Sequence, residues 1–186
     1  MIKQLLTLSA ASTLVLALGM PVVAQASEQE HFREAVEEAI GPIVREDISK
    51  AIEETEHLVK QAAEIVAEAA HGFHDNEKLL LEITSSSTAQ MLTQSPEELE
   101  ESWAHGEAFN DKGFALDDFD HFSKVMAYYD MIVHPATAHS LLKAYQQNPD
   151  HSLLEQAREE LGELLEHEES EEGEEGEEGA EHGKGH

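Results

Sequence analysis

Apolar residues recur at intervals of three and four through most of this chain, from Phe32 to Leu165. This spacing is the period of an α-helix with one buried face, and no stretch shows the two-residue alternation of a half-buried strand. An amphipathic helix cannot bury its apolar stripe alone, so several must pack together. We therefore expect an all-α protein, a helical bundle of about six amphipathic helices over residues 27–167.

Local signals predict where several of these helices begin. Ser27 and Glu30 have the spacing of a capping box, and Asp75 can also start a helix. Ser95 followed by Pro96 is the strongest start, because it combines a capping side chain, a proline at the first helical position and an acidic first turn. That helix is expected to carry Phe109.

Other signals predict helix ends and breaks. A long helix is expected from about Asp47 to Ala70, after Gly41-Pro42 has broken or kinked the preceding one. Asp117 or Asp118 is expected to cap a helix that stops at His134-Pro135, and a further helix should follow that proline. The last helix is expected to run from His151 to about His167.

Residues 1–26 have the pattern of a secretory signal peptide. Lys3 precedes an uncharged, largely apolar run from Leu5 to Val23, and Ala24-Gln25-Ala26 has the form of a cleavage site. The run is also about as long as a membrane anchor, but serine, threonine and glycine dilute it. We expect cleavage after Ala26 and a mature protein in the periplasm or outside the cell.

The C-terminal residues 168–186 consist mostly of glutamate and glycine, with His182 and His186 among them. Such a segment buries too little apolar surface to offset the entropy of ordering it. We expect a disordered acidic tail.

The charge and the missing cysteines exclude several classes of function. The chain has 40 acidic and 11 basic residues, a net charge of −29 with histidine neutral, and this argues against binding to nucleic acid or an anionic membrane surface. It has no cysteine, which excludes disulfides, Fe–S clusters and covalently attached haem. The motifs of the common hydrolase, nucleotide-binding and metalloprotease families are also absent, so we expect no enzyme.

Histidine is the most unusual component, with 12 residues in the chain. Neutral imidazole binds Cu, Ni and Zn, and most of these histidines lie three or four positions from a carboxylate, on the same face of a helix. The high acidic content alone produces most of this pairing. A buried di-iron centre is disfavoured because the period places His57 on the solvent side of its helix. Haem held by histidine and methionine has no pair of residues to select it.

The densest group of possible metal ligands lies where the helix ending near Ala70 stops. Glu64, Glu68, His71 and His74 meet there at a helix terminus that favours cations. They predict the tightest surface metal site of the bundle, and the competing interpretation is a solvated helix end stabilised by protonated histidine. His182 and His186 should add weak binding, because the tail must be ordered around a metal.

Two stretches carry a resemblance to a known class of proteins. Residues 53–59 read Glu-Glu-Thr-Glu-His-Leu-Val, and residues 69–74 read Ala-Ala-His-Gly-Phe-His. In composition they resemble small histidine-rich periplasmic metal-binding proteins, and the resemblance implies metal buffering without catalysis. The aromatic helices after Ser95 have no counterpart in it.

Two functions remain open at this point. The first is an exported protein that binds or buffers divalent cations through surface histidines and carboxylates. The alternative is a non-metal helical adaptor or chaperone-like protein whose acidic, salt-adapted surface keeps it in solution.

Overall fold

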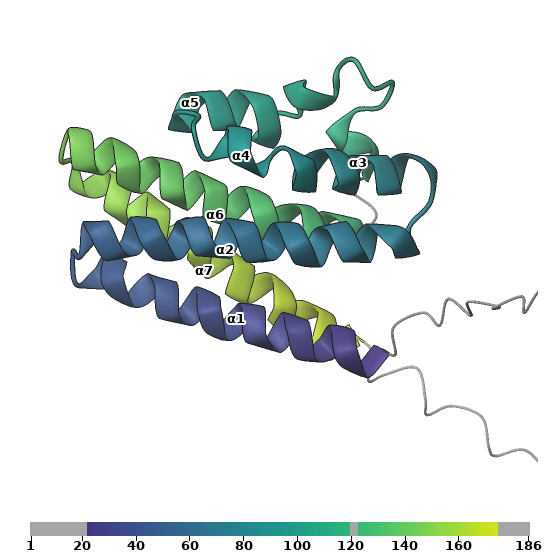
Figure 1. Ribbon diagram of the computed structural model, residues 1–186, viewed down its shortest axis with the longest axis horizontal. Helices are drawn as coiled ribbons and strands as arrows, with labels where there is room; N and C mark the ends of the chain where they lie inside the picture. Colours follow the sequence, from purple (N-terminus) through teal and green to yellow (C-terminus); the bar gives the residue numbers. More distant parts are fainter. Residues whose placement is uncertain (1–21, 120–122, 175–186) are drawn as a thin grey trace, which may run out of the picture.

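The computed structural model describes residues 22–119 and 123–174, and within these ranges it contains seven α-helices and no β-strand. The prediction of an all-α bundle is confirmed. Four long helices form the bundle: α1 (Val22–Val44), α2 (Ile48–Ala69), α6 (Ser123–Gln147) and α7 (His151–Glu174). They run alternately up and down, so that the start of α1 and the end of α7 lie at the same end of the molecule (Figure 1).

The connection between α2 and α6 forms a second layer that lies over those two helices (Figure 1). It contains three short α-helices: α3 (Asp75–Ser86), α4 (Thr88–Met91) and α5 (Pro96–Leu99). The remaining elements are the 3-10 turns η1 (Ala70–Gly72), η3 (Glu107–Phe109) and η4 (Leu116–Phe119), and the π-helix η2 (Glu100–Ala104).

The helix starts that depend on a local cap occur where the sequence places them. The Asp47 side chain accepts a hydrogen bond from the backbone N–H of Lys50 at 3.3 Å, so α2 begins at Ile48. At α5 the Ser95 hydroxyl accepts from the N–H of Glu98, and the Glu98 carboxylate accepts from the N–H of Ser95 at 2.8 Å. Helix α3 begins at Asp75. The predicted starts near Asp47, Asp75 and Ser95 are confirmed.

The predicted break at Pro135 is wrong, and at Gly41-Pro42, where a break or a kink was predicted, the helix is not broken. Helix α1 continues through Pro42 to Val44, and α6 continues through Pro135 as one helix of 25 residues. Each proline removes one backbone hydrogen bond. Pro135 is buried in a helix that packs against both α2 and α7, so the chain keeps its direction there. Pro42 lies two residues before the end of α1, where little of the helix remains to be disturbed.

Two other predictions fail between α5 and α6. The helix from Pro96 ends in the π-helix η2, and Phe109 lies on the separate turn η3. Gly106 separates the two with φ of +74°, where a Cβ atom would come within 2.9 Å of Leu116 Cβ. The expected helix start at Asp117 or Asp118 is replaced by the short turn η4.

Both predicted domain boundaries lie inside helices of the full chain. Helix α1 already begins at Val22, so Ser27 lies within it and does not start it. Helix α7 continues past residue 167 to Glu174, since glutamate is a good helix former and an existing helix extends easily. The rest of the expected signal peptide and of the expected tail lies outside the described residues, and both stay predictions.

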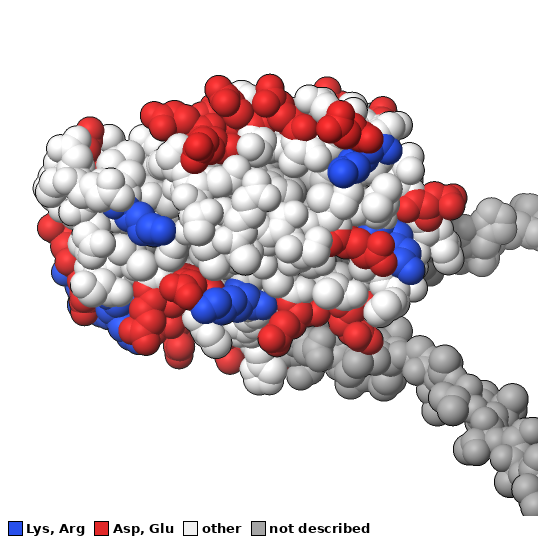
Figure 2. All heavy atoms as spheres, turned by 45° about the horizontal axis from the view of Figure 1, so that its top comes forward, with Lys and Arg blue, Asp and Glu red and all other residues white. Residues whose placement is uncertain are grey.

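Charged residues lie on the outside of this bundle. In the view that brings α3, α4 and α5 forward, acidic side chains outnumber basic ones, and the charged side chains border a large uncharged area (Figure 2). Within the described ranges, no helix has the length and apolar character needed to cross a membrane.

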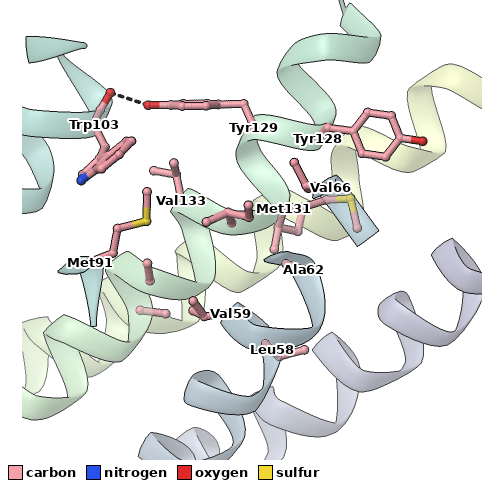
Figure 3. Packing of buried hydrophobic residues seen from close by; sticks show 14 of the residues in the cluster. Leu58, Val59, Ala62, Val66, Met91, Trp103, Tyr128, Tyr129, Met131 and Val133 are labelled. Atoms are coloured by element: carbon pink, nitrogen blue, oxygen red, sulfur yellow. Dashed lines mark hydrogen bonds between the residues drawn. The ribbon is translucent and has the colours of Figure 1, made fainter. Parts of the chain in front are cut away.

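Helix α6 is the centre of the core. It is buried on most of its circumference, with Tyr128, Tyr129, Met131, Ile132 and Val133 all shielded in succession. Figure 3 shows it packed between α2 and the second layer, with the Tyr129 hydroxyl directed at Trp103. A helix that is apolar all round must be covered on all sides, and the second layer covers the side that the other three bundle helices leave open.

Candidate functional site

The predicted cluster at the end of α2 is not assembled as a metal centre. Glu64 and Glu68 are exposed on the last turns of α2, His71 is exposed on η1, and His74 is exposed before α3. After Gly72 the backbone leaves helical geometry, with extended φ and ψ at Phe73 and His74. His74 therefore does not follow His71 on one helix face.

Aromatic packing accounts for this turn in the chain. The Phe73 ring meets the edge of Tyr128 on α6 with ring centroids 5.9 Å apart. This contact ties the α2–α3 connection to the core and directs the neighbouring histidines outward. Across residues 22–119 and 123–174, no three or more His, Asp or Glu side chains are placed to hold a metal ion. His182 and His186 lie outside the described residues.

Two other histidines do form close pairs with carboxylates on the surface. His31 Nδ1 lies 3.6 Å from Glu34 Oε2 on α1, and His105 Nε2 lies 4.0 Å from Glu100 Oε1. The four side chains are each between 65% and 70% exposed. Among the described residues, these are the exposed histidine–carboxylate pairs whose N and O atoms lie within 4.0 Å of each other.

The π-helix determines the second pair. The N–H of His105 donates to the carbonyl of Glu100 at 2.9 Å, a bond between residues five positions apart. Because a π-turn has more residues than an α-turn, His105 lies above Glu100. Sequence spacing had paired His105 with Glu101, four positions away.

The predicted solvent exposure of His57 is confirmed.

His134 occupies a different environment, between α6 and α7. Its Nδ1 lies 2.8 Å from Glu160 Oε2 and 3.8 Å from Glu163 Oε2, and its side chain is 16% exposed. Burial lowers the pKa of His134, but the hydrogen bond to Glu160 and the charges of Asp130, Glu160 and Glu163 outweigh it. The pKa therefore lies above the ordinary value of 6.5, and the protonated ring donates to Glu160.

His139 is the most buried histidine of the described residues, with 3% of its surface exposed. Its Nδ1 lies 3.3 Å from the Thr55 hydroxyl and 3.3 Å from the carbonyl of Ile52, both on α2. Burial, followed by the positive charge of Lys143, lowers the pKa of His139 below 6.5. The ring is therefore held neutral at the α2–α6 interface.

The contact between Thr55 and His139 has the composition of a nucleophile and a base, but not the access. Thr55 is fully buried, and its hydroxyl donates to the carbonyl of Ala51 at 2.9 Å. A substrate cannot reach an oxygen in this position. The pair joins two helices, as does the contact of His134 with Glu160.

Sequence reasoning missed both interhelical histidines because their partners are distant in the chain. Glu160 lies 26 positions from His134, and Thr55 lies 84 positions from His139. The run from Met131 to Leu142, which contains both histidines and no Asp, Glu, Lys or Arg, was the available signal. A helix without charges over three turns is typical of a core position, where a histidine needs a partner.

The comparisons with known proteins add no family. No protein-family model, curated protein or solved structure matches the chain. The function must therefore be argued from the surface chemistry of the chain itself.

Proposed function

We propose that this chain is an exported protein that binds divalent cations weakly, at exposed pairs of one histidine and one carboxylate. The carrying observation is the geometry of His31 with Glu34 and of His105 with Glu100, in which both partners lie within 4.0 Å and face solvent. A net charge of −29 raises the local concentration of cations around such pairs.

Two protein ligands account for the expected weakness of these sites. Water must supply the remaining ligands of a Cu, Ni or Zn ion, and such a site lacks the three or four protein donors of a structural or catalytic centre. Copper(II) should bind more tightly than nickel(II) or zinc(II), as is usual for nitrogen and oxygen ligands. This behaviour suits buffering of cations, in which release matters as much as capture.

The cluster of Glu64, Glu68, His71 and His74 ranks second in this proposal. Its donors must first move together, and that ordering reduces their affinity. His182 and His186 are proposed to add capacity of the same weak kind. Export rests on the pattern of residues 1–26, and the N-terminal mass of the protein from its natural host tests it.

Calorimetric titration of the chelator-stripped full chain with Cu(II) tests cation binding. The His31→Ala/His105→Ala double variant should lose the tightest binding events. The control is His57→Ala/His151→Ala, which removes two exposed histidines that form no ion pair with a described residue. The control should keep those events, and a His71→Ala/His74→Ala variant should lose only weaker ones.

Three results would contradict the proposal. The first is an absence of heat in all four proteins, and the second is an equal loss in the test and control variants. The third is binding that stays unchanged when the pH is lowered to about 5, because a histidine that binds metal must be deprotonated, with an ordinary pKa of about 6.5.

A further inference from the structure

One part of the surface lacks the charge that covers the rest. Residues 83–96, from the end of α3 to the start of α5, contain no charged side chain, although 27% of the whole chain is charged. Figure 2, which brings α3, α4 and α5 forward, shows an uncharged area with acidic side chains and a smaller number of basic ones along its edges. We use the name neutral face for six uncharged residues of α3, of α4 and of the turn after α4: Leu79, Ile83, Ser86, Ala89, Gln90 and Thr93.

The residues of the neutral face have helical spacing. Leu79, Ile83, Ser86, Gln90 and Thr93 follow one another at intervals of four and three. Helix α3 ends at Ser86 and α4 begins at Thr88, and Ser87 between them keeps right-handed helical φ and ψ. Within each helix, this is the spacing with which one helix packs against another.

Exposure distinguishes this stripe from an ordinary polar surface. Leu79 is 37% exposed and is one of two large apolar side chains that are exposed among the described residues. Ser86, Ala89, Gln90 and Thr93 are exposed as well, and Ile83 is half-buried against the core. Uncharged side chains around an exposed leucine cost less to desolvate than charged ones when another surface covers them.

One end of the neutral face has an acidic border. Glu97, Glu98, Glu100 and Glu101 are exposed there, on α5 and η2, whereas Glu82 on α3 is paired with Lys78, with Nζ and Oε1 3.7 Å apart. Depletion of charged residues at the centre is one feature of protein interfaces. A second copy of this chain would place the same acidic borders against each other, and like charges across an interface are costly.

We propose that the neutral face docks a basic amphipathic helix of a partner protein. An apolar stripe on that helix would cover Leu79 and the uncharged residues after it, and flanking lysines or arginines would meet Glu97 and Glu98. This is recognition of one helix by another through residues three and four positions apart. The proposal takes up the adaptor alternative and does not depend on cation binding.

A synthetic peptide tests the docking surface directly. A fluorescent amphipathic helix with leucine on one face and lysine on the others is titrated with the full chain, in EDTA, by anisotropy. We expect saturable binding to the wild-type chain. A peptide with the same leucines and with glutamate in place of lysine should not bind.

Two variants of equal charge separate docking from general attraction to an acidic protein. Leu79→Glu/Gln90→Glu places two carboxylates on the neutral face, whereas Gln146→Glu/Gln156→Glu places two at exposed positions of α6 and α7. Docking predicts that the first pair weakens peptide binding by about tenfold, because it sets carboxylates against the leucines, and that the second pair leaves it equal or slightly tighter. All substituted positions are exposed, and circular dichroism checks that both variants fold.

Three results would overturn this inference. One is the same change of affinity in both variants, which indicates attraction by net charge alone. Another is an absence of binding by the wild-type chain. The third is a concentration-dependent dimer in sedimentation velocity that Leu79→Glu/Gln90→Glu abolishes, which would make a second copy the occupant.

Discussion

At the scale of single residues, His134 makes the bundle sensitive to alkaline pH. Its pKa in the folded protein lies above 6.5, so folding stabilises the protonated ring. That contribution is fully present below about pH 6.5, the unfolded value, and is lost as the pH rises through the folded pKa. We expect His134→Gln to lower the free energy of unfolding at pH 5.5 by about 1.5–3 kcal/mol, the range for a hydrogen bond to a charged group.

Urea unfolding of both proteins from pH 5.5 to pH 9 measures this effect. The difference between wild type and His134→Gln should shrink as the pH rises. A difference that stays constant across the series would show that the ring contributes by packing and not by its charge.

His139 should produce the opposite dependence. Burial and Lys143 hold its folded pKa below 6.5, so the unfolded chain binds a proton more readily than the folded protein. The resulting contribution is present above about pH 6.5 and is lost as the pH falls from there through the folded pKa. In urea unfolding between pH 7.5 and pH 4.5, His139→Leu should therefore lose less stability on acidification than the wild type. Equal slopes for the two proteins would refute the prediction.

At the scale of elements, aromatic packing and side-chain hydrogen bonds from Tyr129, Ser140 and Lys143 attach the second layer to α6. The Tyr129 hydroxyl donates to the Trp103 carbonyl in η2 at 2.6 Å, and Trp103 Nε1 donates to Gln94 at 3.0 Å (Figure 3 shows the first). Phe109 packs against Trp103 and Tyr129, with ring centroids 5.7 and 6.2 Å away. Burial also raises the pKa of Tyr129, which keeps its hydroxyl protonated and able to donate.

Tyr129→Phe should destabilise the protein by about 0.5–1.5 kcal/mol, the net value of one hydrogen bond, because the Trp103 carbonyl loses this donor but keeps the N–H of Gly106 at 3.1 Å. The matched control is Tyr145→Phe, at a half-buried position of the same helix, which should change stability by less than about 0.5 kcal/mol. Chemical denaturation followed by circular dichroism measures both. Equal effects would assign no special role to the hydrogen bond.

At the scale of the whole molecule, like charges oppose folding. Residues 27–167 contain 31 acidic and 9 basic side chains, a net charge of −22. Folding brings these charges together, and salt screens them over a Debye length of about 10 Å at 0.1 M and about 3 Å at 1 M. Apart from the pair of His134 with Glu160, the described ion pairs lie mostly at the surface, such as Lys50 with Glu53, so their loss to screening is small.

We therefore expect the melting temperature to rise between about 10 mM and 1 M sodium chloride, an interval over which the Debye length falls from about 30 Å to about 3 Å. Potassium chloride should act equally, because the effect depends on ionic strength. A melting temperature that is unchanged or lower at high salt would contradict this account of the acidic surface.

The helix periodicity and the caps were sufficient to predict the fold class and several boundaries. Asp47 and Ser95 act on backbone groups three positions away, so the residues that decide these two starts are close together in the sequence. The solvent exposure of His57 follows from the same local period. These features need no knowledge of the rest of the molecule.

The continuity of α6 and the partners of its histidines depend on contacts between distant segments. Pro135 favours a break on local grounds, yet packing against α2 and α7 holds the helix together. In the sequence, only side chains a few positions away suggested a role for His134 and His139. Their partners on α7 and α2 lie 26 and 84 positions away and are identified by the packing of the helices. The sequence by itself therefore determined the helices, the acidity and the supply of histidines. The tertiary structure decided which histidines are buried and paired, because burial and charge pairing depend on which helix faces meet.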